Sequence, residues 1–372
     1  MKQASRIWNI TFNKAVTTWG FEHLPCEWCV YRCQSPTGTI IFSLHVDDIF
    51  SAASSPDETA SFKALLESQW EIADLGPAKF ALRIAISRDT SSHTISLSQT
   101  TYIDRLLERF NLTDANPADT PMVAGLQLHR PDKTTPTPPK IEEWRLHTPY
   151  RELVGSLNYA AIATRPDIAY AVSRLSSFHD CYMPDHWSAA IHVLRYLKGT
   201  RTLSLTLGGD RSPSLLGYSN SDYANCVDTS CSISSYCFSL GLGVISWSSR
   251  KQKVVADSSC YAEYVALHNA SHETSFLRQL LDGLGFTKSS PTPLHCDNVA
   301  ATHLTEDHIF HPHVKHIRVK FHHIRDMVSD GELRMNRVRS CDNIADILTK
   351  SLGRSNFLRL RTYLSLSDPS LR

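Results

Sequence analysis

The sequence predicts a mixed fold, α+β in residues 1–128 and α/β in residues 207–353. In the first of these regions, helix-like and strand-like segments follow one another in no regular order, which is typical of α+β structure. In the second, three strand-like runs precede a long helical segment, and strands and helices then alternate, which indicates a mixed sheet covered by helices. With 372 residues and 42% hydrophobic composition, the chain can build two or three separate cores.

Residues 1–128 contain three predicted helices and three predicted strands. Apolar residues at a spacing of three or four predict helices, and short apolar runs rich in β-branched residues predict strands. The expected elements are a helix over Ile7–Trp19, a strand pair over Ile40–Ala52, a helix over Ser61–Trp70, a strand over Phe80–Ser87 and a helix over Gln99–Phe110.

Residues 129–149 are predicted to be a linker rich in proline and threonine. Proline lacks the N–H donor and fixes φ, so we expect neither a helix nor a central strand here. Residues 150–206 are predicted to be helical. Within them, Arg165-Pro166-Asp167 marks the start of a helix, because proline suits the first helical turn.

Residues 207–353 are predicted to form the α/β region, followed by a tail over residues 354–372. The helix prediction from Val314 rests on apolar residues that repeat at spacings of 3, 4, 3 and 4. The expected elements are strands over Leu215–Asn220, Ser235–Leu240 and Val244–Ser249, a helix over Ser258–Leu284, a strand over Pro293–Asp297, a helix over Val314–Val328, a strand over Glu332–Val338 and a closing helix from Asn343.

Composition limits the possible partners. Thirty-eight Lys and Arg against 37 Asp and Glu give a formal charge of +1, so any affinity for nucleic acid must come from local basic segments. No apolar run approaches the roughly 20 residues of a membrane span, and no leader follows Met1. We therefore expect an intracellular protein, neither secreted nor bound to a membrane, whose ten cysteines stay reduced. The oligomeric state is not predicted.

The first chemical motif is the pair Asp47 and Asp48. An apolar strand leads into the pair and another leads out, so both aspartates are expected at the tip of a hairpin. Neighbouring residues of a strand point to opposite faces, and only the turn lets both carboxylates serve one site. Such a pair suits Mg²⁺ ions that activate a primer hydroxyl. Asp-Asp is also an ordinary turn sequence, and the residues alone leave both interpretations open.

The second motif is a set of three acids on separate elements. Asp297 follows a strand and precedes a helix, which is where sites of α/β proteins gather. Glu263 lies in the first turns of the long helix, and Asp346 lies in the closing helix with Lys350 one turn beyond. Three such carboxylates can converge on two Mg²⁺ ions that hydrolyse a phosphodiester. Alternatively, Glu263 and Asp346 are solvated surface acids and Asp297 caps a helix.

These motifs resemble, in order along the chain, those of the carboxyl-terminal part of copia-type retrotransposon Pol polyproteins. The resemblance implies a partial reverse-transcriptase palm and thumb in residues 1–128, a helical connection in residues 150–206 and a ribonuclease H-like domain in residues 207–353. The matching strings are KQASRIW (2–8), HVDD (45–48), LSQTTYIDRLLERF (97–110), YRELVGSLNYAAIATRPDIAY (150–170), VLRYLKGT (193–200), ISWSSRKQK (245–253), AEY (262–264), CDN (296–298), VKHI (314–317) and ADILTK (345–350).

The resemblance assigns roles to these acids, with Mg²⁺ or Mn²⁺ as the cofactor. Asp47 and Asp48 match two of three polymerase carboxylates, and the third is expected upstream of Met1. Glu263, Asp297 and Asp346 match three of the four ribonuclease H acids, and the acids of both sites are expected to bind the metal ions. The fourth position holds Asn220, whose amide keeps the shape of aspartate without its charge. Asp222, two residues further along the strand, is a weaker candidate for the missing carboxylate.

Two smaller departures from the family pattern are also expected of a copy that has lost part of its activity. His45 stands where the family has Tyr, and Arg83 stands where the family has Gly in a Phe-Leu-Gly-Ile strand. With Asn220 and the expected upstream carboxylate, they imply a truncated and partly inactivated copy.

Nucleic-acid contacts are expected from Arg250, Lys251 and Lys253. These residues follow a strand and precede the Glu263 helix, so they can neutralise phosphates near the acids. A solvated basic turn is the alternative. The expected partner is an RNA–DNA hybrid or a primer–template. The function is then an RNA-directed DNA polymerase with ribonuclease H, or a non-catalytic remnant that binds nucleic acid, and the sequence does not decide whether this copy is an active enzyme.

Overall fold

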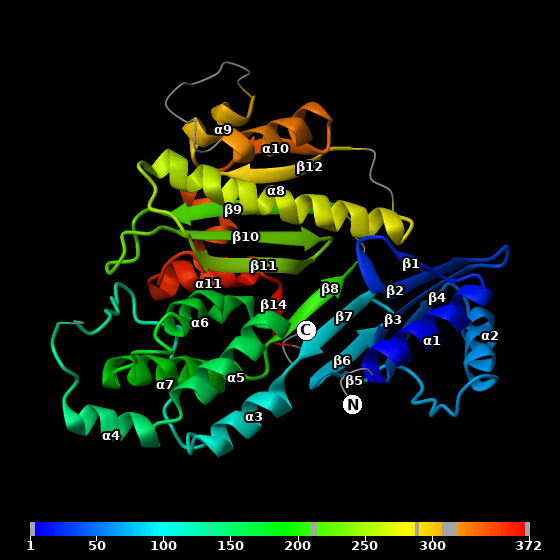
Figure 1. Cartoon of the computed structure of the whole chain (residues 1–372), viewed down its shortest axis with the longest axis horizontal. Coiled ribbons are helices and arrows are strands. Elements are labelled where there is room, and N and C mark those ends of the chain that lie inside the picture. Colours follow the sequence, from blue (N-terminus) through cyan, green and yellow to red (C-terminus); the bar gives the residue numbers. More distant parts are fainter. Residues whose placement is uncertain (1–3, 133, 210–213, 287–289, 307–317, 369–372) are drawn as a thin grey trace. The chain divides into compact units, whose positions relative to one another are not determined.

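The computed structural model describes residues 4–132, 134–209, 214–286, 290–306 and 318–368 (Figure 1). The chain forms two compact units, one from residues 1–78 with 273–290 and one from residues 79–272 with 291–372. The long helix α8 (Ser259–Gly283) begins in the second unit and ends in the first. Within the described ranges, no helix is both long enough and apolar enough to cross a bilayer. The finer domain boundaries expected from the sequence stay predictions.

The first unit is built on an antiparallel sheet whose four strands follow chain order. Aromatic residues fill its core, and the buried ring of Phe42 stacks on those of Tyr31 and Phe62 at 4.8 and 4.9 Å. The predicted first helix and strand pair are confirmed. The elements are α1 (Ala4–Thr18), β1 (Glu22–Leu24), β2 (Glu27–Gln34), β3 (Thr39–His45), β4 (Asp48–Ala53) and α2 (Pro56–Glu67).

Helix α2 starts five residues before the predicted Ser61. The Ser55 hydroxyl accepts a hydrogen bond from the Glu58 backbone N–H at 3.2 Å and caps the helix. Pro56 then occupies the first helical position, where its fixed φ is favourable. The local capping residues therefore set this helix start, which the apolar spacing did not show.

The second unit contains a five-stranded sheet in the order β14-β8-β7-β6-β5. The single strand predicted over Phe80–Ser87 is wrong, because the chain reverses at Leu82 and Arg83, whose φ angles are 49° and 63°. Arg83 is therefore an exposed turn residue. The strands are β5 (Phe80–Ala81), β6 (Ile84–Asp89), β7 (Thr94–Ser98), β8 (Ser204–Gly208) and β14 (Leu366–Ser367).

Helices fill residues 150–199, as predicted, but one further helix lies within the expected linker. Pro139 is the first residue of α4 (Pro139–His147), where its missing N–H leaves no hydrogen bond unmade. The proline argument excludes a helix interior and does not exclude a helix start. The helices of this region are α3 (Thr100–Arg109), α4, α5 (Tyr150–Ala163), η1 (Pro166–Ile168), α6 (Ala169–Ser176) and α7 (Pro184–Gly199).

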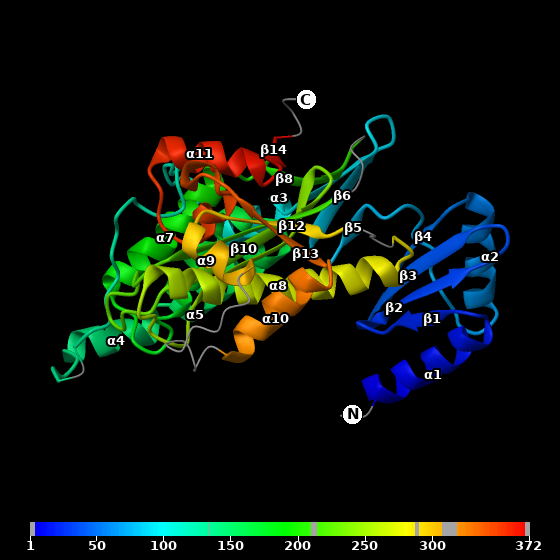
Figure 2. The ribbon, with the colours of Figure 1, turned by 90° about the horizontal axis from the view of Figure 1, so that it is seen from above.

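A second five-stranded sheet of this unit has the order β11-β10-β9-β12-β13. Strands β9, β10 and β11 are antiparallel neighbours, whereas β12 is parallel to both β9 and β13. Helices α8 and α10 lie on one side of it and α11 on the other (Figure 1, Figure 2). The elements are β9 (Leu215–Asp222), β10 (Ile233–Leu240), β11 (Gly243–Lys251), β12 (Thr292–Cys296), α9 (Val299–Glu306), α10 (Arg318–Ser329), β13 (Leu333–Arg337), η3 (Ser340–Asp342), η4 (Ile344–Leu348) and α11 (Arg354–Tyr363).

The strands and the long helix predicted for this region are confirmed, with two qualifications at its end. The closing helix is the short 3-10 helix η4, and the tail folds into α11 and β14. Helix α10 is described from Arg318, so the predicted start at Val314 and the VKHI string lie outside the described residues.

A buried ion pair ties the helices of the second unit together. Arg165 and Asp167, both fully buried, form two hydrogen bonds of 2.7 and 2.9 Å. Arg165 also donates to Thr200 at the end of α7, and Tyr196 donates to Asp167. Arg361 of α11 donates to the Tyr196 hydroxyl at 3.1 Å. The Arg-Pro-Asp string thus starts a helix, as predicted, and links η1, α7 and α11 as well.

Removing one partner of this pair should destabilise the second unit strongly. Asp167→Asn leaves the Arg165 guanidinium buried without its counter-charge, so the free energy of unfolding should fall by about 3–5 kcal/mol. Chemical denaturation followed by circular dichroism measures this loss. The matched control is Asp180→Asn, which breaks an Arg130 pair whose carboxylate is 67% exposed and should cost less than about 1 kcal/mol. Equal losses in the two variants would contradict the role assigned to the buried pair.

Candidate active site

The first pair of predicted acids lies at a hairpin tip, as expected. His45 pairs with Asp48, so Val46 and Asp47 form a two-residue turn, with Val46 at φ 56°. The Trp8 indole N–H donates to the Val46 carbonyl at 2.9 Å and ties the turn to α1. Asp47 and Asp48 are both exposed, and no hydrogen bond or ion pair to either carboxylate is present in the described part of the chain. The pair is free to bind a cation.

The ribonuclease-type acids meet at one end of the second sheet. Asn220 lies near the end of β9, and Asp297 directly follows the neighbouring parallel strand β12. An added Cβ at Gly217 would stand 2.4 Å from the Phe238 ring and 2.9 Å from Leu294, so glycine lets β9 pack closely here. Glu263 comes from the second turn of α8, and Asp346 comes from η4.

Two side chains fasten η4 to this sheet. The Asn343 amide donates to the Ser219 carbonyl at 2.9 Å and to Asp297 Oδ1 at 3.4 Å. The Ser235 hydroxyl donates to the Ala345 carbonyl at 2.8 Å. The 3-10 helix therefore holds Asp346 beside β9, although an α-helix was predicted there.

Glu263 is the most buried acid of the set, with 7% of its surface exposed. Its Oε2 is buried and makes no hydrogen bond with any residue that the structure describes. Burial raises the pKa of Glu263 well above its ordinary value of 4.5, and the nearby charge of Asp297 raises it further. An unpartnered buried carboxylate oxygen is what a divalent cation would stabilise.

The side of the cluster that contains Glu263 and Asp297 has the composition of a cation site. One ligand atom from each of Glu263, Cys296 and Asp297 lies within 4.8 Å of the others. Burial raises the pKa of the Cys296 thiol, so the sulfur stays protonated and is a poor ligand. The two carboxylates supply hard oxygen ligands, and Mg²⁺ or Mn²⁺ fits them better than a soft metal does.

The other side of the cluster contains nitrogen donors. The Asn220 amide donates to Asp346 Oδ1 at 3.2 Å, and the Lys350 ammonium lies 2.6 Å from the same oxygen. Burial would lower the pKa of Lys350, but the hydrogen bond and charge of Asp346, with Asp222 and Asp297 nearby, raise it overall. Lys350 therefore remains a cation inside the acid cluster.

Asp222, the weaker candidate for the missing carboxylate, lies close to this group. Its side chain accepts a hydrogen bond from Asn225. Burial raises the pKa of Asp222, and the hydrogen bond from Asn225 and the charge of Lys350 oppose that rise. Its nearest polar partners are therefore Asn225 and Lys350, and its role as a metal ligand stays a prediction.

The predicted nucleic-acid segment begins at the same end of the sheet. Arg250 pairs with Ser234, which pairs with Ser221, so Arg250 is two strands away from the residue that follows Asn220. Arg250, Lys251 and Lys253 are exposed. Gln252 between them is buried and donates to Ser234 and to the Ala262 carbonyl at 2.7 and 2.9 Å. That amide positions the basic segment against the helix of Glu263.

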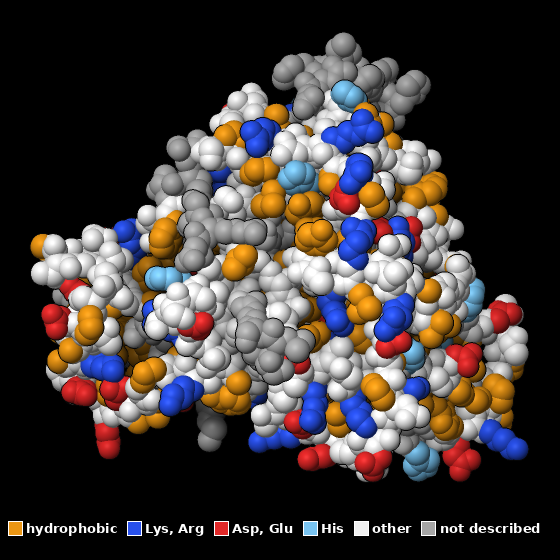
Figure 3. All heavy atoms as spheres, turned by 180° about the vertical axis from the view of Figure 1, so that it is seen from behind, with side chains coloured by type: hydrophobic (Ala, Val, Ile, Leu, Met, Phe, Trp, Pro, Cys, Tyr) orange, Lys and Arg blue, Asp and Glu red, His pale blue; other side chains and the backbone are white. Residues whose placement is uncertain are grey.

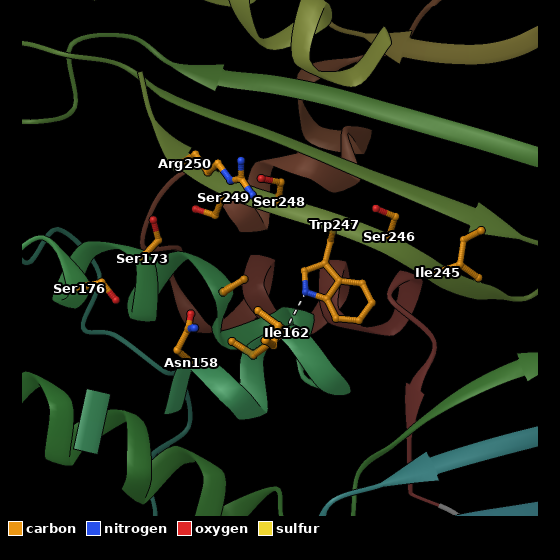
Figure 4. A pocket seen from close by; sticks show the side chains of 12 residues that line it. Asn158, Ile162, Ser173, Ser176, Ile245, Ser246, Trp247, Ser248, Ser249 and Arg250 are labelled. Atoms are coloured by element: carbon orange, nitrogen blue, oxygen red, sulfur yellow. Dashed lines mark hydrogen bonds between the residues drawn. The ribbon is translucent and has the colours of Figure 1, made fainter. Parts of the chain in front are cut away.

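A pocket of about 480 Å³ adjoins this segment between α5, α6 and β11. Arg250, Ser248 and Ser249 gather at one end of it, and the Trp247 indole donates to the Ala161 carbonyl at 2.8 Å (Figure 4). On the face shown in Figure 3, Lys and Arg side chains are spread singly among acidic and neutral ones. That spread agrees with the formal charge of +1.

The structure adds four residues that sequence reasoning did not place in the site. Cys296 and Asn343 lie next to acids that were predicted, and the Asn343 side chain also caps η4 by accepting from Ala345. The sequence shows that Lys350 lies one turn after Asp346. The spacing alone does not show that the Lys350 ammonium contacts the Asp346 carboxylate. Gln252 stood between predicted basic residues and gave no signal of burial.

These observations define a ribonuclease H-like sheet with acids from three elements and an asparagine from a fourth at one end, preceded by a hairpin with the Asp-Asp motif. A family profile described as reverse transcriptase (RNA-dependent DNA polymerase) matches residues 1–124. The retrovirus-related Pol polyprotein from transposon TNT 1-94 of Nicotiana tabacum is 37% identical over 358 residues, 96% of this chain and 27% of that protein. That from transposon RE1 of Arabidopsis thaliana is 36% identical over 357 residues, 96% of this chain and 24% of that protein.

The chain belongs to the retrovirus-related Pol polyproteins of copia-type transposons, and its residues 1–124 match their reverse-transcriptase region. It spans about a quarter of the length of these two relatives. Among solved structures, LC11-RNase H1 in complex with RNA/DNA hybrid is 15% identical and gives a TM-score of 0.28 over 37% of this chain and 94% of that chain.

Without metal, the buried Glu263 should make stability depend on pH. Below about pH 4.5 the carboxyl is protonated in both states, and above it the unfolded chain releases a proton that the folded chain retains. The free energy of unfolding should therefore fall as pH rises toward the raised pKa. In chelator, Glu263→Gln should melt at a higher temperature than the wild type at about pH 7, and the difference should vanish at about pH 4.

The matched control is Glu108→Gln, an exposed glutamate of α3 that keeps its hydration on folding. Its melting temperature should follow that of the wild type at every pH. If Glu263→Gln were the less stable protein at about pH 7, the carboxyl would be satisfied in the fold and its burial would carry no penalty.

Proposed function

We propose that this chain binds RNA–DNA hybrids and primer–templates and carries a weakened ribonuclease H site for the RNA strand. The observation that carries the proposal is the convergence of Glu263, Asp297 and Asp346 from α8, β12 and η4 at one sheet end. Three elements distant in sequence bring their acids to one place, which solvated surface acids or a helix cap would not require. An intracellular location agrees with this substrate and stays a prediction.

Each residue has a distinct role in this proposal. Glu263 and Asp297 would hold a divalent cation, and Asp346 lies beside Asn220, where a second cation would lack the fourth carboxylate. Bound Mg²⁺ or Mn²⁺ supplies Lewis-acid stabilisation and an activated water for phosphodiester hydrolysis. Asn343 orients Asp297, and Gln252 fixes the segment whose Arg250, Lys251 and Lys253 would neutralise backbone phosphates.

The hairpin acids Asp47 and Asp48 would serve the polymerase reaction. Their exposure and the Trp8 hydrogen bond, which fixes the turn, support a role as metal ligands at a primer terminus. We therefore assign the pair to a primer–template site and base the tests below on the ribonuclease H region.

Binding to an RNA–DNA hybrid should depend on the basic segment and on salt. Replacing Arg250, Lys251 and Lys253 with alanine removes up to three phosphate contacts, so the slope of log affinity against log salt should become shallower by about 2–3. Fluorescence anisotropy with a labelled hybrid at several salt concentrations measures both quantities. The control replaces Arg88, Arg105 and Lys140, which are exposed elsewhere, and should change the slope much less. An unchanged slope in the first variant would remove this segment from the interface.

Ribonuclease H activity should be weak in the wild type and should increase in Asn220→Asp. A carboxylate restores the charge that a second divalent cation requires, and several kcal/mol of transition-state stabilisation correspond to at least about a hundredfold in rate. Cleavage of a labelled RNA strand in a hybrid measures it, and adding Asp297→Asn should abolish the gain. If the wild type already cleaves well and Asp222→Asn stops it, Asp222 is the fourth acid. If no variant cleaves but hybrid is bound, the chain is a non-catalytic binding remnant.

A further inference from the structure

The two sides of the acid cluster differ in how their oxygens are satisfied. On one side, Glu263 Oε2 is buried and receives no hydrogen bond from the described part of the chain. On the other side, Asp346 Oδ1 receives both the Lys350 ammonium at 2.6 Å and the Asn220 amide at 3.2 Å. A carboxylate oxygen offers two lone pairs, and both are engaged here. Two groups of the protein itself, the Lys350 ammonium and the Asn220 amide, therefore occupy Asp346 Oδ1.

The position of Lys350 is fixed by the local backbone. The Thr349 backbone N–H and hydroxyl both donate to the Asp346 carbonyl, at 3.1 and 2.9 Å, so the turn between the two residues is closed. The Lys350 side chain is 43% exposed and that of Asp346 only 16%. An ion pair with one partially desolvated member is held more firmly than a surface pair, because water competes less for the carboxylate.

The Lys350 ammonium is surrounded by carboxylates that would also attract a divalent cation bound at the same place. Asp346, Asp222 and Asp297 all act on its ammonium, and Asn220 adds no negative charge where the family has a carboxylate. The ammonium already neutralises one charge of this reduced set, and a divalent ion at the same place would have one carboxylate fewer than the family pattern provides. Asn220 also donates to the oxygen that such an ion would need.

We propose that the Lys350 ammonium, supported by the Asn220 amide, takes the place of the second divalent cation, so that this chain binds a single divalent ion between Glu263 and Asp297. The proposal rests on the proposed function, in which the acid cluster is a metal site. It assigns Lys350 as a positioning residue that competes with metal for Asp346. The alternative is a structural ion pair that leaves metal binding unaffected.

The test counts bound ions directly. Free Mn²⁺ is measured by electron paramagnetic resonance as the full chain is titrated, in an Asp47→Asn, Asp48→Asn background that removes the exposed hairpin acids. The wild-type cluster should bind one ion per chain. Lys350→Met removes the ammonium and keeps a long side chain, so a second ion should bind, with an affinity about ten- to a hundredfold above any second-ion binding in the wild type. Lys350→Arg keeps the charge and should bind one ion.

Two controls separate this effect from loss of folding or of surface charge. Thermal melting of each variant in chelator verifies that the fold is kept, and Lys253→Met removes an exposed lysine of the basic segment and should leave one ion bound. Two ions of similar affinity in the wild type, or a single ion in both the wild type and Lys350→Met, would overturn the role of Lys350 while leaving the metal site in place. No Mn²⁺ binding in any variant would overturn the proposed function, and this proposal with it.

Discussion

The second unit depends on how several carboxylates are kept together at one end of a sheet where water is scarce. Ionised acids in such a place repel each other and lose hydration, and each needs a proton, a donor or a cation. This chain uses all three means. Burial raises the pKa of Glu263, so it tends to keep its proton, Asn343 donates to Asp297, and Lys350 and Asn220 engage Asp346. The cluster is thus accommodated by the protein's own groups, except at Glu263 Oε2.

The fold produces this crowding through strand order. Because β12 is parallel to β9 and adjacent to it, the residues after Cys296 meet the end of β9 around Asn220. Helix α8 then supplies Glu263 from one side of the sheet, and Gln252 anchors the preceding basic segment to that helix. The short helix η4 supplies Asp346 because Asn343 and Ser235 tie it to β9 and β10. Each acid is held by a helix or strand that packs in the core. The arrangement of the acids is therefore kept even though residue 220 carries no charge.

The sequence could predict the features that depend on local pattern. The hairpin of Asp47 and Asp48, the strand end at Asp297 and the helix of Glu263 all follow from apolar spacing and turn chemistry. It failed where a single local contact overrides the pattern. Examples are the turn at Leu82 and Arg83, which splits a predicted strand, and Pro139, which starts a helix inside the predicted linker. The inward direction of Lys350 and the burial of Gln252 depend on tertiary packing, which no spacing rule in one sequence contains.

Asn220, at the position where the family pattern has aspartate, changes which groups satisfy the neighbouring carboxylate of Asp346. With a carboxylate there, the cluster would carry an excess of negative charge that favours divalent cations over an ammonium. With an amide, the same oxygen of Asp346 gains a donor, and the ion pair with Lys350 is sufficient to balance it. The asparagine therefore removes one metal ligand, and it also donates a hydrogen bond that stabilises Asp346 in the absence of metal. A site altered in this way loses one metal position, while the surrounding sheet keeps its shape because its Ile233, Cys237 and Val244 belong to a buried hydrophobic core.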